Sequence, residues 1–532
     1  MRFFRNPFCS DRPFRRTVWL VMAGLLLSAV TTLRAEADDS VSAIKIGDRR
    51  ELFVETTLIR RLNDAQLRMH HPVPQEIVLS HDAPWEGTGS GYHTVIQDGD
   101  LYRLYYRGLH LDVHQGRVNQ GQHPAFTCYA ESRDGIHWTK PNLGLVEFNG
   151  STANNIIVKG LGTHNFAPFL DTNPEADAEA RYKAVAGVMS EGGLFAFQSA
   201  DGIHWSLVSD QPVITKGAFD SQNVAFWDAS IGMYRAYYRI FTGGVTEKGN
   251  WKPSGLRAIR TATSPDFLNW TTGTNLTYVD SPDVELYTNQ VAPYSRAPHL
   301  LIGMPTRYID RGWSAAMRDL PGREERELRA SANQRYGTAI TEGMLMASRE
   351  GVLFKRWNET FLRPGIGRPG TWHYGHQYIA RNVVTTAGSL PGAPDELSLY
   401  ATEGYWQGSG TKLRRYTLRL DGFVSVHAQW SEGELLTRPF TFDGDSLQLN
   451  YSTSAAGGLR VELQDADGTP FPGFSLEDCG ELFGDTVAGD VRWNEKTDVA
   501  SLADNTARMR VVLRDGGLYS SRSVPSPDNE QS

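Results

Sequence analysis

The hydrophobic residues of this chain gather in short runs rich in Tyr, Phe, Val and Leu, and turn residues such as Gly, Asp and Asn separate the runs. Examples are LYRLYYR (101–107), MYRAYYR (233–239) and ELSLYATE (396–403). Runs of this length and composition, bounded by turn residues, are typical of β-strands. With 11% aromatic residues and 52 Gly, the chain is predicted to be all-β.

One phrase recurs after such runs: SRDGIHW (132–138), SADGIHW (199–205), SPDFLNW (264–270) and, loosened, SREGVLFKRW (348–357). Its serines are 67, 65 and 84 residues apart, which suits one four-stranded propeller blade per copy. A turn of Asp-Gly type followed by Trp is hairpin chemistry, so each phrase is predicted to join the two outer strands of a blade. The alternative is a set of coincidental turns in an unrelated all-β protein.

Five blades can be placed by working back from these phrases. Their predicted inner strands are residues 91–96, 165–171, 219–228, 286–294 and 373–384. A charged insertion at 309–334 accounts for the longest interval and is expected to hold a short helix. Residues 51–59 are predicted to close blade five, which would remove an exposed sheet edge.

Alternating polar and apolar residues at 446–454, 458–468 and 509–517 predict a β-sandwich after the propeller. We therefore expect a five-bladed β-propeller at 44–430, a sandwich at 431–524 and a disordered tail at 525–532.

Residues 1–37 have the features of an export signal: an Arg-rich leader, an apolar run at 18–30 and a small-residue cleavage site at 35–37. The apolar run has 13 residues, short of the roughly 20 that a membrane helix needs. The protein is expected to be exported to the periplasm or the extracellular space, with no membrane span.

The net charge of −8 becomes −13 once the six Arg and one Asp of residues 1–35 are removed. This balance argues against nucleic acid as a partner. Cys128 and Cys479 lie far apart, and neither a CxxC motif nor a Cys/His pattern with metal-ligand spacing occurs. No metal and no cofactor is predicted.

Successive strands of a blade run in opposite directions. If the inner strands start at one face of the propeller, the second strands end at that face and the third strands start there, so residues at these three places share one rim. The polar residues placed there are His93, Asn165, Asp220, Gln222, Asn223, Asn289, Gln290, His373, His376, Arg107, Arg239, Arg307, Glu403 and Glu342.

The runs FDSQNVAFWD (219–228), YTNQVAPYSRAPHLLIGMPTRY (287–308) and LSLYATEGYW (397–406) resemble the glycoside hydrolase superfamily that contains families 32, 43 and 68, specifically family-32-like proteins. The resemblance implies acidic residues around the channel that cut a glycosidic bond. It implies Asp220 as base or transition-state stabiliser and Glu403 or Glu342 as general acid, with Glu285 as a further competitor. The family's blade-one motif Asn-Asp-Pro-Asn-Gly is replaced by TGSGYH (88–93), which has no carboxylate.

Arg107, Arg239 and Arg307 end the second strands of three blades in matching positions. A guanidinium fork suits carboxylate or sulfate, so an acidic or sulfated glycan is the expected ligand. The alternative is that these arginines pair with acidic residues between blades. The further residues predicted to bind substrate are His93, Asn223, Asn289, Gln290 and His376.

The sequence thus predicts an exported glycoside hydrolase that acts on a poly- or oligosaccharide by carboxylate acid/base chemistry. The alternative is a non-catalytic glycan-binding propeller, either a lectin or a degenerate enzyme, which the missing blade-one carboxylate favours. A sialidase-like propeller is a third possibility, since the repeated phrase is similar to the Asp-box turn, but it would need six blades.

Overall fold

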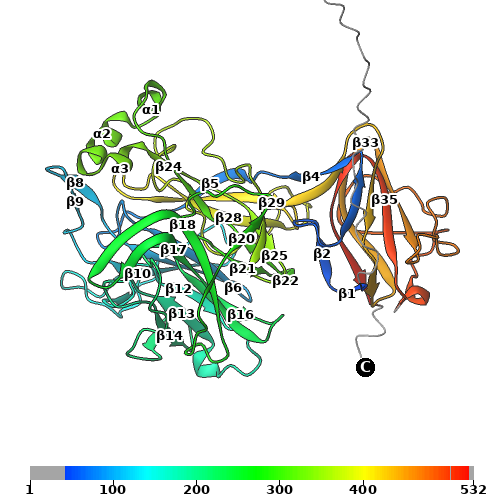
Figure 1. Ribbon diagram of the computed structural model, residues 1–532. Coiled ribbons are helices and arrows are strands. Elements are labelled where there is room, and N and C mark those ends of the chain that lie inside the picture. The colour runs from blue at the N-terminus through cyan, green and yellow to red at the C-terminus, as the bar shows by residue number, and fades with distance from the viewer. Residues whose placement is uncertain (1–41, 504, 526–532) are drawn as a thin grey trace, which may run out of the picture. The chain divides into compact units, whose positions relative to one another are not determined.

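The computed structural model describes residues 42–503 and 505–525, which leaves the predicted signal peptide and all but the first residue of the predicted tail outside the described residues. No helix in this part of the chain is long and apolar enough to cross a membrane. The protein is all-β, a five-bladed β-propeller followed by a C-terminal β-sandwich (Figure 1).

The blades are successive antiparallel sheets whose strands pair in chain order from the inside out. Blade one contains β6 (Gly91–Asp98), β7 (Leu101–Gly108), β10 (Phe126–Ser132) and β11 (Ile156–Lys159). Blade two contains β12 (Ala167–Leu170), β13 (Tyr182–Ala186), β14 (Phe195–Ser199) and β15 (Ser206–Leu207). Blade three contains β16 (Val224–Asp228), β17 (Met233–Glu247), β18 (Asn250–Ser264) and β19 (Thr274–Asn275).

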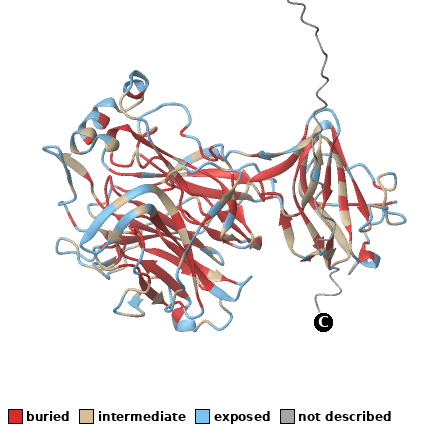
Figure 2. Ribbon diagram, in the orientation of Figure 1, coloured by how far each residue is buried: buried red, intermediate tan, exposed pale blue. Residues whose placement is uncertain are grey.

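Blade four contains β21 (Ala292–Tyr294), β22 (Ala297–Gly303), β25 (Met346–Ser348) and β26 (Leu353–Arg356), with β20 (Thr277–Val279) added in parallel at its edge. Figure 2 shows buried residues along the blade strands and exposed ones on the outer part of the long β17–β18 hairpin.

Blade five combines strands from both ends of the propeller: β27 (Val384–Thr386), β28 (Glu396–Glu403), β29 (Lys412–Arg419) and the N-terminal β5 (Val73–Ser80). Closure by an N-terminal strand was predicted, but the choice of residues 51–59 was wrong. Leu52, Phe53 and Val54 are at most 1% exposed, too apolar for the outer edge of a blade, whereas most residues of β5 are partly or fully exposed.

The repeated phrase forms the same turn after the third strand of blades one, two and three. In the first copy, Ser132 Oγ accepts a hydrogen bond from Gly135 N (2.9 Å), and Asp134 Oδ1 accepts from the backbone N–H groups of residues 136 and 137 (both 2.8 Å). Trp138 Nε1 donates to Gly135 O (3.1 Å). Equivalent Asp and Trp contacts recur in the next two copies. These contacts are all local, so the phrase has a structural role.

The insertion in blade four holds three helices: α1 (Ala315–Asp319), α2 (Arg323–Ala332) and α3 (Gln334–Thr338). They lie between β23 (Thr306–Asp310) and β24 (Ala339–Gly343), which pair with each other. The predicted short helix is therefore a helical cluster carried on a two-stranded arm.

The sandwich is built on β33 (Ser446–Gln464) and β35 (Arg508–Val524), joined by β30 (Val424–Ala428), β31 (Gly433–Thr437) and β34 (Asp485–Asp490). The N-terminal strands β2 (Arg50–Leu52), β3 (Ile59–Asn63) and β4 (Ala65–Met69) pair into the same sheet, and β1 (Ile44–Gly47) pairs with β32 (Phe440–Phe442). Cys479 packs in this core and Cys128 in that of blade one; both are buried and free.

Candidate functional site

Asp220 lies just before β16, on the loop that leads into the inner strand of blade three. Asn165 Nδ2 donates to Phe219 O (2.6 Å) and Ser221 O (2.8 Å), and Asn223 Nδ2 donates to Phe219 O (3.0 Å). These bonds fix the backbone on both sides of Asp220. The Asp220 side chain is 59% exposed, so a rigid loop presents its carboxylate to solvent.

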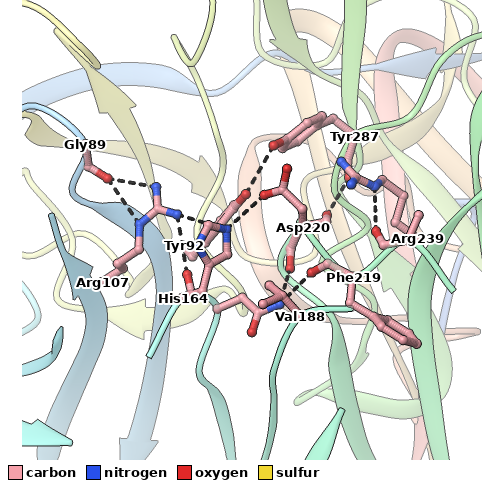
Figure 3. Close-up of polar contacts among 12 residues, drawn as sticks. Gly89, Tyr92, Arg107, His164, Val188, Phe219, Asp220, Arg239 and Tyr287 are labelled. Atoms are coloured by element: carbon pink, nitrogen blue, oxygen red, sulfur yellow. Dashed lines mark hydrogen bonds and ion pairs between the residues drawn. The ribbon is translucent and has the colours of Figure 1, made fainter. Parts of the chain in front are cut away.

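The partner of this carboxylate is His164, whose Nε2 donates to Asp220 Oδ1 at 2.8 Å (Figure 3). The surrounding protein displaces part of the water around this carboxylate, which alone would raise the pKa of Asp220, but the hydrogen bond from His164 and the charges of Arg239 and Arg107 lower it well below its ordinary value. Asp220 is therefore a carboxylate at every pH near neutrality.

Arg107 is buried next to His164, and its guanidinium group forms hydrogen bonds within the protein. Its Nη2 donates to Gly89 O (2.8 Å) and to Tyr405 OH (3.3 Å), and its Nη1 donates to His164 O (3.4 Å). Its guanidinium carbon lies 4.6 Å from the centre of the Tyr92 ring. Arg107 therefore braces the site and adds positive charge.

Arg239 is buried next to Asp220 but keeps two nitrogens available. Its Nε donates to Ala218 O (2.8 Å), and its guanidinium carbon lies 4.9 Å from the centre of the Tyr287 ring. Within the described residues, neither Nη makes a hydrogen bond, and neither is sealed from solvent. A fixed guanidinium with free donors is suited to bind an anionic group.

Tyrosines surround these charges. The hydroxyls of Tyr92 and Tyr287 are 3.3 Å apart, and Tyr374 OH donates to Tyr287 OH at 3.4 Å. Burial raises the pKa of Tyr92 and of Tyr374 well above the usual value and that of Tyr405 to about 12, and the negative charge of Asp220 contributes to each. These three hydroxyls keep their protons and remain hydrogen-bond donors.

Glu403 does not join this site. Arg368 Nη1 donates to its Oε2 at 2.9 Å, Arg414 Nε donates to its Oε1 at 2.5 Å, and the residue is 3% exposed. Burial would raise the pKa of Glu403, but these hydrogen bonds lower it. A general acid needs a raised pKa, so the structure argues against that role for Glu403.

Glu342 and Arg307 pair with each other across β23 and β24, with Arg307 Nε donating to Glu342 Oε1 at 2.8 Å. Arg307 Nη2 also donates to Thr360 Oγ1 at 2.8 Å. Glu285 is bound by Arg257 in the same way. These contacts match the alternative in which the arginines pair with acidic residues of the protein. Neither glutamate is left free to transfer protons.

His93 and His376 are buried structural residues. His81 Nδ1 lies 2.8 Å from Thr411 O, so His81 presents a bare Nε2 to His93 Nε2 at 3.0 Å. His376 Nδ1 accepts from Trp372 N at 3.1 Å. Burial lowers the pKa of His93 well below its usual value and that of His376 to about 3, so both are neutral.

The predicted amide ligands hold the blades together instead of facing solvent. Gln290 Nε2 donates to Gln222 Oε1 (2.7 Å) and Ile379 O (2.6 Å), and Asn289 Nδ2 donates to Tyr237 O (3.2 Å). Gln290, Asn289 and Asn223 are each 1% exposed. Gln290 and Asn289 use their donors in cross-blade bonds, and Asn223 uses its donors within its own loop, so all three position the loops around Asp220.

Of the predicted site residues, then, the structure brings together Asp220, Arg107 and Arg239. Sequence reasoning missed His164 and the tyrosines. His164 directly precedes Asn165 at the start of the blade-two inner segment, which is the signal that could have revealed it. Within residues 42–503 and 505–525, no group of three His, Cys, Asp or Glu side chains is arranged to hold a metal ion.

No family model and no curated protein matches the chain. Among solved structures it is similar to an N-acetylgalactosamine deacetylase from F. plautii, with 14% identity over 66% of this chain and 94% of that chain and a TM-score of 0.38. It is also similar to a family-43 arabinoxylan arabinofuranohydrolase from Bacillus subtilis (12% identity, 84% and 97% covered, TM-score 0.37). A third similar structure is the family-32 β-fructofuranosidase of Bombyx mori, with 11% identity over 86% of this chain and 95% of that chain and a TM-score of 0.37. Similarity at this level assigns no reaction, so function rests on the side chains.

Proposed function

We propose that this is an exported glycan-active protein, a glycoside hydrolase whose substrate binds over Asp220. The observation that carries the proposal is an exposed, ionised carboxylate on a rigid loop, flanked by His164 and Arg239 and surrounded by tyrosines. A carboxylate that stays ionised suits a nucleophile or a stabiliser of an oxocarbenium-like transition state. Tyrosine rings and hydroxyls suit contacts to a sugar.

The substrate is proposed to be acidic or sulfated. Arg239 supplies the reason, since its two Nη nitrogens are free while its position is fixed from Nε and from the ring of Tyr287. A local cation of this kind would attract an anionic sugar to a protein whose net charge is −8.

The test is a screen of the purified protein against neutral, uronate-containing and sulfated polysaccharides, in which release of reducing sugar is measured for wild type and Asp220→Asn. Wild type is expected to release sugar, and the variant to lose about 10²–10³-fold in kcat, the typical cost of removing one electrostatic stabiliser. An Asp220→Asn variant that remains fully active would refute the role of Asp220.

A second candidate is a non-catalytic glycan binder. It is favoured by the ion pairs of Glu285, Glu342 and Glu403, which leave none of the three free to act opposite Asp220. In that case wild type would bind a polysaccharide in calorimetry without releasing sugar, and Arg239→Gln would weaken the binding.

A further inference from the structure

Cleavage of a glycosidic bond needs a proton for the leaving oxygen as well as a carboxylate. Asp220 cannot supply that proton, because its pKa is lowered and it is ionised. The glutamates predicted for the task are bound by arginines. The proton donor must therefore be a different kind of group. The proton on His164 Nε2 is already donated to Asp220, and the other proton-bearing groups around Asp220 are tyrosine hydroxyls.

Tyr287 differs from its neighbours because two other tyrosine hydroxyls lie within hydrogen-bonding distance of its own. Tyr374 OH donates to it at 3.4 Å, and Tyr92 OH lies 3.3 Å away. The guanidinium of Arg239 lies over its ring at 4.9 Å. In Figure 3 the Tyr287 hydroxyl points toward the Tyr92 hydroxyl on the side where the Asp220 carboxylate lies.

Two hydroxyls and one guanidinium lie close to the oxygen and the ring of Tyr287. Tyr92 and Tyr374 stay protonated and can donate to a phenolate oxygen, and the charge of Arg239 is attracted to the negative ring. Tyr378 stacks on Tyr287 with ring planes 4° apart and centres 5.5 Å apart, which fixes the orientation of the acid.

We propose that Tyr287 is the general acid of the glycosidase reaction, an assignment that rests on the proposed function. The Tyr287 O–H bond breaks and its proton goes to the glycosidic oxygen as the bond from that oxygen to the anomeric carbon breaks. The carboxylate of Asp220 stabilises or captures the anomeric centre. Water then attacks that carbon and gives a proton to the Tyr287 phenolate, which restores both groups.

The test compares two glycosides of the sugar that wild type releases: the methyl glycoside, whose leaving group must be protonated, and the dinitrophenyl glycoside, whose leaving group departs as an anion. Tyr287→Phe keeps the ring under Arg239 and removes only the hydroxyl. It is expected to lower kcat on the methyl glycoside by about 10²–10⁴-fold and on the dinitrophenyl glycoside by less than about tenfold.

Tyr278→Phe on β20 (Thr277–Val279) is the matched control, because the Tyr278 hydroxyl is buried, has no partner among the described residues and lies outside the cluster of tyrosines that contains Tyr287. It should leave both rates unchanged, and melting temperatures of both variants establish that they fold. Equal losses by Tyr287→Phe on the two glycosides, or no loss on either, would overturn the assignment alone. A wild type that cleaves no glycoside would overturn the proposed hydrolase function and the assignment with it.

Discussion

His164 Nε2 donates a 2.8 Å hydrogen bond to Asp220 Oδ1, and this contact joins two blades at the most exposed of the predicted catalytic carboxylates. His164 precedes the inner strand of blade two, and Asp220 precedes that of blade three. The two residues are 56 positions apart, so only the propeller arrangement brings them together. The hydrogen bond from His164 helps to lower the pKa of Asp220.

The folded protein should lose the stabilising contribution of Asp220 in acid. Its pKa is lower when folded than the ordinary value, so the contribution is complete above about pH 4 and disappears as pH falls through the folded value. Because the side chain is 59% exposed, the gain is expected to be below about 1 kcal/mol. Urea unfolding of wild type and Asp220→Asn from pH 3 to pH 7 measures it; a difference that grows toward acid would contradict this sign.

Glu403→Gln should lower the free energy of unfolding and leave kcat unchanged. The substitution leaves Arg414, whose side chain is 18% exposed, without a counter-charge, and breaking a buried pair typically costs about 3–5 kcal/mol. The neutral amide retains part of the hydrogen bonding, so a loss near 3 kcal/mol is expected in urea unfolding. If Glu403 were the general acid, kcat would instead fall steeply while the unfolding midpoint stayed in place.

Much of the fold could be read from the sequence because strand period and turn chemistry are local. The repeated phrase fixed the outer turns, since Asp134 and its equivalents bond only to neighbours in the chain. The closing strand could not be identified in this way. Residues 51–59 have the composition of a strand and were chosen, whereas the strand that closes blade five is β5, most of whose residues are partly or fully exposed.

The site was harder to predict, because residues at matching places in the sequence do not occupy equivalent places in the structure. Arg239 and Arg307 were predicted to end second strands, yet Arg239 lies within β17 beside a tyrosine ring, and Arg307 lies on β23 and meets Glu342 on the arm of blade four. Which arginine is free depends on contacts between distant segments. The ion pair of Glu403 could not be foreseen for the same reason, since its partner Arg414 lies on the adjacent strand.

Asp201→Ala should destabilise blade two without changing the site. Asp201 Oδ1 accepts hydrogen bonds from Ile203 N (2.9 Å) and His204 N (2.8 Å), and losing them should cost about 1–3 kcal/mol. His204→Ala is the control: that side chain is 69% exposed, so its removal should cost less than about 0.5 kcal/mol. Thermal unfolding checks both. Equal effects of the two variants would mean that the backbone bonds to Asp201 contribute little.

Arg239→Gln and Arg307→Gln should separate the two arginines that the sequence treats alike. Arg239 has free Nη donors beside Asp220, so its loss should weaken binding of an acidic oligosaccharide by about tenfold or more, the value of one charged hydrogen bond. Arg307 is occupied by Glu342 and Thr360, so its variant should bind as wild type does. Calorimetry at low and high salt measures both, and the Arg239 effect should shrink at high salt because dissolved ions screen the attraction between its solvent-accessible Nη groups and the free ligand. A loss of affinity in Arg307→Gln that matches the loss in Arg239→Gln would show that the ligand reaches the arm of blade four.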